Sequence, residues 1–140
     1  MILYAEPSAV LAWLLGETDG AKVRELLASA AMIFASRLTT AEAERGLARL
    51  ETGASLPSAE AAVLRETLSH AASHWIRRDI DAAVLARVGR SFPVEPVRTL
   101  DAIHLATVLE LRASEPRLAI LSLDHRIRGN AERLGIGVVP

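Results

Sequence analysis

The sequence predicts an α/β protein that is built on one parallel sheet. Short apolar runs alternate with helical segments along all 140 residues. Most of these runs are apolar at every position, which is typical of strands that are buried on both faces. The length is that of a single domain with its own hydrophobic core. We therefore predict one domain over residues 1–140, with a central, twisted parallel sheet of about five strands and helices on both faces.

The first half of the chain contains two expected strands and four expected helices. Residues 2–5 form an apolar run that ends at Glu6, and Pro7 suits the first position of the following helix, where its missing N–H costs nothing. Gly16 ends that helix. Thr39 and Glu42 match a capping box, which opens a later helix. The other elements are expected as a helix over 19–30, a strand over 32–35, and helices over 39–50 and 58–72.

The second half contains three expected strands and three expected helices. A strand is expected near 74–76, and the segment Asp79-Ile80-Asp81 opens a helix that runs to about residue 90. A proline-rich loop over 91–96 leads to an almost wholly apolar helix, which Thr99 caps. This helix ends near residue 112, and it is followed by a strand over 118–121, a helix over 125–134 and a last strand over 136–139.

Composition excludes several classes of function. The chain has no cysteine, which excludes disulfides, thiolate zinc sites and cysteine nucleophiles. No apolar run approaches the ~18 residues needed to cross a bilayer, and the N-terminus lacks the features of a signal peptide, so we expect a cytoplasmic protein. The net charge of −1 gives no global attraction to nucleic acid. An RNA ligand would need local cations, for which the candidates are Arg37, Arg98, Arg126 and Arg128.

Acidic side chains occupy the starts of four expected helices, namely Glu6, Glu42, Asp101 and Asp124. Glu6 and Asp124 directly follow strands, and strand ends of this kind lie at the same edge of a parallel sheet. Glu42 lies one turn beyond a strand, and Asp101 lies in the first turn of its helix. Carboxylates at one edge repel one another unless a cation lies between them, and an all-oxygen site favours Mg²⁺ or Mn²⁺. The four acids together predict a divalent metal site.

Each acid also has a purely structural interpretation. Glu6 can flank the helix that begins at Pro7, and Glu42 can complete the capping box. Asp101 can interact with its helix dipole, and Asp124 can cap the last helix. For any one acid considered alone, this interpretation stays open.

The four acids lie in the segments Glu6-Pro7-Ser8-Ala9, Leu38-Thr39-Thr40-Ala41-Glu42, Leu100-Asp101-Ala102-Ile103-His104-Leu105-Ala106 and Ser122-Leu123-Asp124. In this order the segments resemble the four motifs of PIN domains, in particular those of VapC-type toxins from bacterial toxin–antitoxin pairs. The segment that contains Asp101 is the most specific of the four, and together they span the chain.

The resemblance implies an endoribonuclease that uses Mg²⁺ or Mn²⁺ to hydrolyse RNA phosphodiester bonds. It implies that Glu6, Glu42, Asp101 and Asp124 bind the metal, and that Asp101, Asp124 and Glu42 are the catalytic candidates. A cognate antitoxin and a homodimer are also implied. PIN domains normally have Asp at the position of Glu6. The side chain of Glu is longer than that of Asp by one methylene.

A second hypothesis is a catalytically weak PIN-like module that binds protein or RNA, motivated by Glu6 and Pro7 in place of the usual pair. His104 lies three residues after Asp101, on the same helix face. It is expected either beside the acids or as a partly buried histidine that is bonded to backbone. Trp75 is expected in the core.

Overall fold

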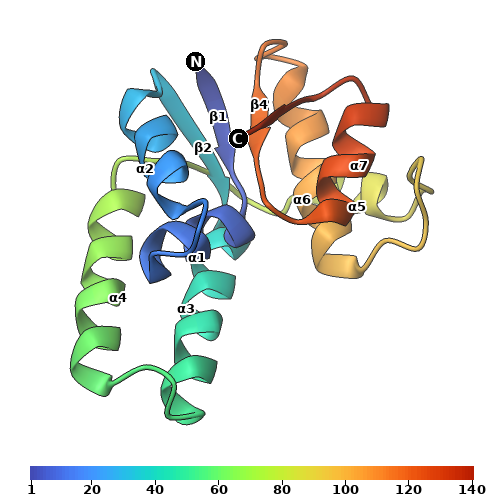
Figure 1. Cartoon of the computed structure of the whole chain (residues 1–140). Helices are drawn as coiled ribbons and strands as arrows, with labels where there is room; N and C mark the ends of the chain where they lie inside the picture. Colours follow the sequence, from blue (N-terminus) through green and yellow to red (C-terminus); the bar gives the residue numbers. More distant parts are fainter.

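Five parallel strands form one sheet in the order β3-β2-β1-β4-β5 (Figure 1). The computed structural model describes all 140 residues. The strands are β1 (Ile2–Ala5), β2 (Met32–Ser36), β3 (Ile76–Arg78), β4 (Ala119–Leu121) and β5 (Gly137–Val139). The helices are α1 (Pro7–Leu15), α2 (Gly20–Ser29), α3 (Arg37–Thr52), α4 (Ser58–Ala72), α5 (Ala82–Val88), α6 (Thr99–Arg112) and α7 (His125–Arg133). The predicted fold class is confirmed.

The central strands explain the uniformly apolar runs of the sequence. β1 pairs with β2 on one side and with β4 on the other. Its residues Leu3, Tyr4 and Ala5 have no exposed surface, and neither do Ile120 and Leu121 of β4. The edge strands β3 and β5 are more exposed. No helix of the structure is long and apolar enough to cross a membrane.

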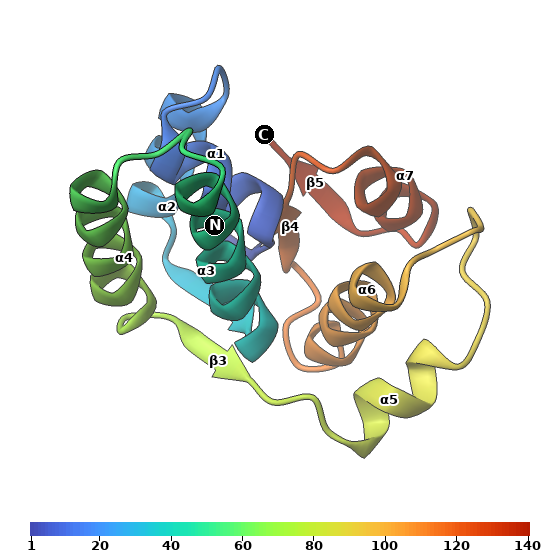
Figure 2. The same cartoon turned by 90° about the horizontal axis from the view of Figure 1, so that it is seen from below.

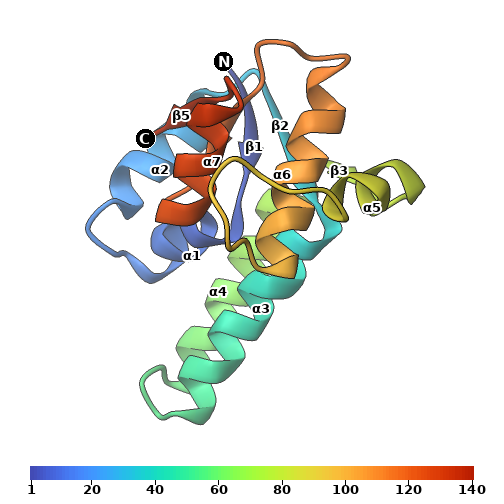
Figure 3. The same cartoon turned by 90° about the vertical axis from the view of Figure 1, so that its right-hand side faces the viewer.

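Helices cover both faces of the sheet. Figure 2 shows α1–α4 on one side and α5–α7 on the other, and Figure 3 shows the α3–α4 pair projecting beyond the sheet. The chain adds β2 and β3 on one side of β1, and then returns to add β4 and β5 on the other side. Because crossovers are right-handed, the helices that follow β3 lie on the opposite face from those before it. Tyr4, Leu105 and Ile120 belong to the core under α6 and α7, whereas Val10 and Leu68 belong to the core under α1, α3 and α4.

β1 and β4 are neighbours in the sheet, and the strand order runs in opposite directions on either side of this pair. Ligands of open parallel sheets bind outside the carboxyl ends of the strands at such a switch point, because the two following helices leave on opposite faces. Glu6 directly follows β1, and Ser122 directly follows β4. The topology therefore places these two segments beside each other.

Three predicted element boundaries are wrong. Ser36, and not Thr39, caps α3: its hydroxyl accepts from the Leu38 N–H, and the helix begins directly at the end of β2. The Thr39 hydroxyl instead donates to the carbonyl of Ala5, so the predicted capping box with Glu42 does not form. Thr99 is the first residue of α6 and does not cap it. The third strand begins at Ile76 because the N–H groups of His74 and Trp75 still bond to carbonyls at the end of α4. Trp75 lies in the core, as expected.

The loop that leads into α6 is fastened to α7 by Asn130. This side chain is fully buried, accepts from the Val94 N–H at 2.8 Å and donates to the Val94 carbonyl at 2.9 Å. Asn130→Ala leaves both backbone groups without their protein partner, so we expect a loss of about 1–2 kcal/mol in the free energy of unfolding, measured by urea titration. Glu132→Ala, an exposed change on the same helix, should stay within about 0.5 kcal/mol of wild type. Equal values for the two variants would contradict the fastening role.

Candidate active site

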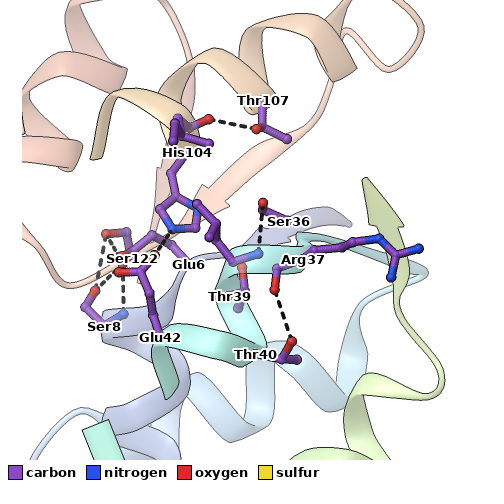
Figure 4. Close-up of polar contacts among 12 residues, drawn as sticks. Glu6, Ser8, Ser36, Arg37, Thr39, Thr40, Glu42, His104, Thr107 and Ser122 are labelled. Carbon is purple, nitrogen blue, oxygen red and sulfur yellow. Dashed lines mark hydrogen bonds and ion pairs between the residues drawn. The ribbon is translucent and has the colours of Figure 1, made fainter. Parts of the chain in front are cut away.

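Glu6 is buried at the carboxyl end of β1, where its side chain caps α1. Only 5% of the residue is exposed. Its Oε2 atom accepts from the Ser8 N–H at 3.1 Å, from the Ser8 hydroxyl and from the Ser122 hydroxyl at 2.8 Å. Figure 4 shows this group between the ends of β1 and β4. The predicted helix-flanking role is present, and the carboxylate also joins the two central strands.

Ser8 connects Glu6 to the turn that carries Asp124. Its hydroxyl oxygen accepts from the N–H groups of Leu123 at 2.9 Å and of Asp124 at 3.1 Å, while its proton goes to Glu6. Asp124 in turn caps α7, because its Oδ1 accepts from the N–H groups of Arg126 at 2.8 Å and of Ile127 at 3.1 Å. The position of Asp124 therefore depends on the buried Glu6 and Ser8 pair.

Glu42 is held by a buried histidine. His104 is 1% exposed, and its Nε2 lies 2.7 Å from Glu42 Oε1, as Figure 4 shows. Its other ring nitrogen, Nδ1, lies 2.7 Å from the hydroxyl of Tyr4. The expectation of a partly buried histidine bonded to backbone is wrong, since both contacts are to side chains. The sequence analysis did not single out Tyr4, whose only signal there is a hydroxyl within an otherwise apolar expected strand.

Asp101 lies in the first turn of α6 and is partly buried. Burial raises the pKa of its carboxyl group, and the negative charges of Asp124 and Glu42 raise it further, while the positive charge of Arg98 acts in the opposite direction. Asp101 is thus a desolvated carboxylate within electrostatic range of two other acids.

The four acids come from four elements, and three of them interact directly through charge. Asp101, Asp124 and Glu42 form one electrostatic group, whereas Glu6 is tied to the Asp124 turn through serines. No three His, Asp or Glu side chains stand as a ready-made cage for one ion. These side chains nevertheless fit a hard divalent cation. The negative charge of Asp101 is repelled by those of Asp124 and Glu42, which a cation would offset. The available ligand atoms are carboxylate oxygens, since both ring nitrogens of His104 already have hydrogen-bond partners.

The arginines proposed for phosphate contact have different positions. Arg37 is paired with Asp79 on the exposed surface. Arg128 donates to the carbonyls of Ser122 at 2.8 Å and of Pro140 at 3.3 Å, so it supports the end of β4. Arg98 and Arg126 are exposed.

The buried Glu6 gives a pH-dependent contribution to stability. Burial raises the pKa of its carboxyl group, and the hydrogen bonds from Ser8 and Ser122 only partly offset this. Because the pKa is higher in the folded than in the unfolded state, the contribution is full below the unfolded value near 4.5 and is lost as pH rises through the folded value.

We therefore expect the free energy of unfolding of wild type minus that of Glu6→Gln to fall as the pH rises from 4.5 toward neutral, measured by urea titration in EDTA. Gln keeps an oxygen for the two serines but has no charge to desolvate. Glu60→Gln, an exposed change in α4, serves as the control and should give a difference that does not vary in this way. A pH-independent difference for Glu6→Gln would contradict the shift.

Comparison with known proteins gives a consistent result. The profile of the PIN domain matches residues 5–132. Ribonuclease VapC46 of Mycobacterium tuberculosis is 32% identical over 137 residues, which are 98% of this chain and 95% of that protein. Ribonuclease VapC35 of the same species is 38% identical over 63 residues, 45% of this chain and 46% of that protein.

Solved structures share the fold. FitAcB from Neisseria gonorrhoeae aligns with a TM-score of 0.66 at 22% identity, covering 100% of this chain and 97% of that one. VapC20 of Mycobacterium tuberculosis, a toxin that cleaves the sarcin–ricin loop, aligns with a TM-score of 0.62 at 11% identity, covering 91% and 93%. A complex of FitAB with a DNA fragment contains a chain that aligns with a TM-score of 0.66 at 21% identity, over 99% and 94%.

Proposed function

Since this chain belongs to the PIN domain family, we propose that it is an endoribonuclease that depends on Mg²⁺ or Mn²⁺ and acts as the toxin of a toxin–antitoxin pair. The observation that carries the proposal is the state of Asp101, whose partly buried charge is opposed by Asp124 and Glu42. A protein that only needed a helix start there would be more stable with a neutral residue. A cation and a phosphodiester at the carboxyl edge give this arrangement a use.

The acids have separable roles in the proposed reaction. Asp101, Asp124, Glu42 and Glu6 would hold the ion, Glu6 through Oε1 because Oε2 already accepts three hydrogen bonds. When bound, the metal supplies a water of lowered pKa and neutralises charge on the phosphoryl oxygens. Asp101 would take the proton of the attacking water, and Asp124 is the alternative acceptor, because both carboxylates belong to the same electrostatic group. No covalent intermediate on the protein is required.

The proposed partners follow from the relatives. FitAB is solved bound to a DNA fragment, FitAcB is a second solved neighbour, and VapC46 is named as a ribonuclease. We extend this to a cognate antitoxin that binds this chain, to an RNA substrate in the cytoplasm and to a homodimer. Co-expression with the product of the neighbouring reading frame should yield a complex in which RNA cleavage is suppressed.

A second candidate is a PIN-like module that binds protein or RNA with little catalysis. The hydrogen bonds from Ser8 and Ser122 to Glu6 Oε2 favour this candidate. They leave Glu6 only one oxygen for a metal ion, whereas a free carboxylate offers two. In that case Mg²⁺ and Mn²⁺ would bind weakly, because Mg²⁺ needs near-ideal octahedral geometry.

The deciding experiment incubates the purified protein with structured and single-stranded RNAs in Mn²⁺, in Mg²⁺ and in EDTA, while calorimetry measures metal affinity in parallel. Cleavage with either metal and none in EDTA supports the nuclease. RNA or antitoxin binding without turnover, together with weak metal affinity, supports the binding module. Cleavage that persists in EDTA would reject both proposals, the metal-dependent nuclease and the binding module.

A further inference from the structure

Two short hydrogen bonds in series connect Glu42, one of the four acids of the site, to the protein interior. Tyr4 Oη lies 2.7 Å from His104 Nδ1, and His104 Nε2 lies 2.7 Å from Glu42 Oε1. Tyr4 has no exposed surface and His104 has 1%, whereas the Glu42 side chain is 28% exposed. The series therefore begins in the core between β1 and α6 and ends at the site.

The number of protons in this series restricts its arrangement. An ionised carboxylate only accepts hydrogen bonds, so the short contact with Glu42 requires a proton on His104 Nε2. In a neutral imidazole the other nitrogen, Nδ1, is then an acceptor, and the Tyr4 hydroxyl is the group that can donate to it. In the opposite tautomer, a lone pair of Nε2 would face Glu42 Oε1 at 2.7 Å and repel it.

We propose that Tyr4 and His104 are positioning residues for Glu42: Tyr4 selects the Nε2–H tautomer of His104, and this N–H fixes Glu42 so that its second oxygen faces the metal site. The proposal rests on the proposed function only in assigning Glu42 to that site. The tautomer itself is a property of the metal-free protein.

Packing alone does not explain this pair. The two rings meet edge to face with centroids 5.9 Å apart, a contact that Phe and Leu at these positions would also make. The hydroxyl and the imidazole instead bring polar atoms into the core, which is costly unless they are bonded. Groups that hydrogen-bond to metal ligands fix the tautomer and the direction of those ligands, and their loss typically lowers metal affinity about 10–100-fold.

The first test measures the tautomer directly. Long-range ¹H–¹⁵N spectra of histidine-labelled, metal-free protein should show His104 neutral with its proton on Nε2, and Tyr4→Phe should shift it toward a mixture of tautomers. An Nδ1–H tautomer or a doubly protonated ring in wild type would overturn the proposal, as would an unchanged tautomer in Tyr4→Phe.

The second test measures whether the effect passes through Glu42. Tyr4→Phe should weaken Mn²⁺ binding about 10-fold in calorimetry, and the same change should have no further effect in a Glu42→Gln background. Thr107→Val is the matched control, because it also removes a buried hydroxyl from this core but one that bonds only within α6. It should leave both the tautomer and the Mn²⁺ affinity as in wild type.

The possible failures are distinguishable. A tautomer that changes in Tyr4→Phe while Mn²⁺ affinity stays at the wild-type value overturns the positioning role and leaves the nuclease proposal intact. An equal loss of affinity in the Glu42→Gln background overturns it too, because the hydroxyl would then act through general stability. Wild type that binds no Mn²⁺ and cleaves no RNA overturns the proposed function, and in that event the positioning role toward a metal falls with it.

Discussion

Asp101→Asn should reduce metal-dependent RNA cleavage by more than ~100-fold in kcat/KM, because it removes a proposed metal ligand, for which the loss should exceed the 10–100-fold typical of outer-shell partners. Asn keeps the shape of the side chain at the start of α6 but has no charge and cannot take up a proton. The measurement is a single-substrate cleavage assay in Mn²⁺, with matched protein concentrations of wild type and variant.

Folding of this variant should be unimpaired, which separates a chemical defect from a structural one. In EDTA near neutral pH, Asp101→Asn should be at least as stable as wild type, because it removes a carboxylate whose pKa burial and the charges of Asp124 and Glu42 raise. Asp19→Asn is the matched control, since Asp19 is exposed and makes no capping bond with its side chain. Equal cleavage by wild type and Asp101→Asn would count decisively against the proposed nuclease.

Metal binding should also appear in thermal unfolding. A ligand at 100 times its Kd adds about 2.7 kcal/mol to the stability of the protein that binds it. Saturating Mn²⁺ should therefore raise the Tm of wild type and of Asp19→Asn, and should have little effect on Asp101→Asn. A rise of equal size in all three proteins would show that the ion binds elsewhere.

Ser8→Ala should lower the free energy of unfolding by about 2–3 kcal/mol, because one hydroxyl serves three partners. The Leu123 N–H loses its acceptor, the Asp124 N–H keeps only the Ser122 hydroxyl, and Glu6 loses a donor in a buried site. Urea titration at neutral pH measures the change. The same variant should weaken Mn²⁺ binding about 10-fold, since the turn that carries Asp124 is no longer fixed.

Ser29→Ala provides the comparison for this change. Ser29 is exposed at the end of α2, where its hydroxyl donates only to the carbonyl of Leu26. Its loss should cost less than about 0.5 kcal/mol and leave metal affinity unchanged. If Ser8→Ala were as mild as Ser29→Ala, Glu6 would hold the two strand ends together without the serine, and the network would be less important than its geometry indicates.

The local pattern of apolar residues in the sequence was sufficient to predict the architecture. Apolar runs without alternation indicate strands buried on both faces, and β1 and β4 are such strands. Glu6 and Asp124 were expected near each other because each follows a strand of a parallel sheet, and the Glu6–Ser8–Asp124 hydrogen bonds connect them. Helix starts were less predictable. The first acceptable cap, Ser36 at the end of β2, displaced the capping box because the chain enters α3 without a loop.

By itself, the sequence determined the α/β class, the order of the elements and the position of Glu6, Asp101 and Asp124 at helix starts, since these depend on residue periodicity and on short-range capping. Glu42 was expected at a helix start too, but it lies in the second turn of α3 because that helix begins at Arg37. Only the tertiary structure decided what each acid contacts. Glu6 accepts from serines 2 and 116 residues away, and His104 lies between Tyr4 and Glu42, which are 100 and 62 residues away. The physical reason is that a buried polar atom must find a partner wherever the packed chain offers one, and that choice follows from the packing of distant segments.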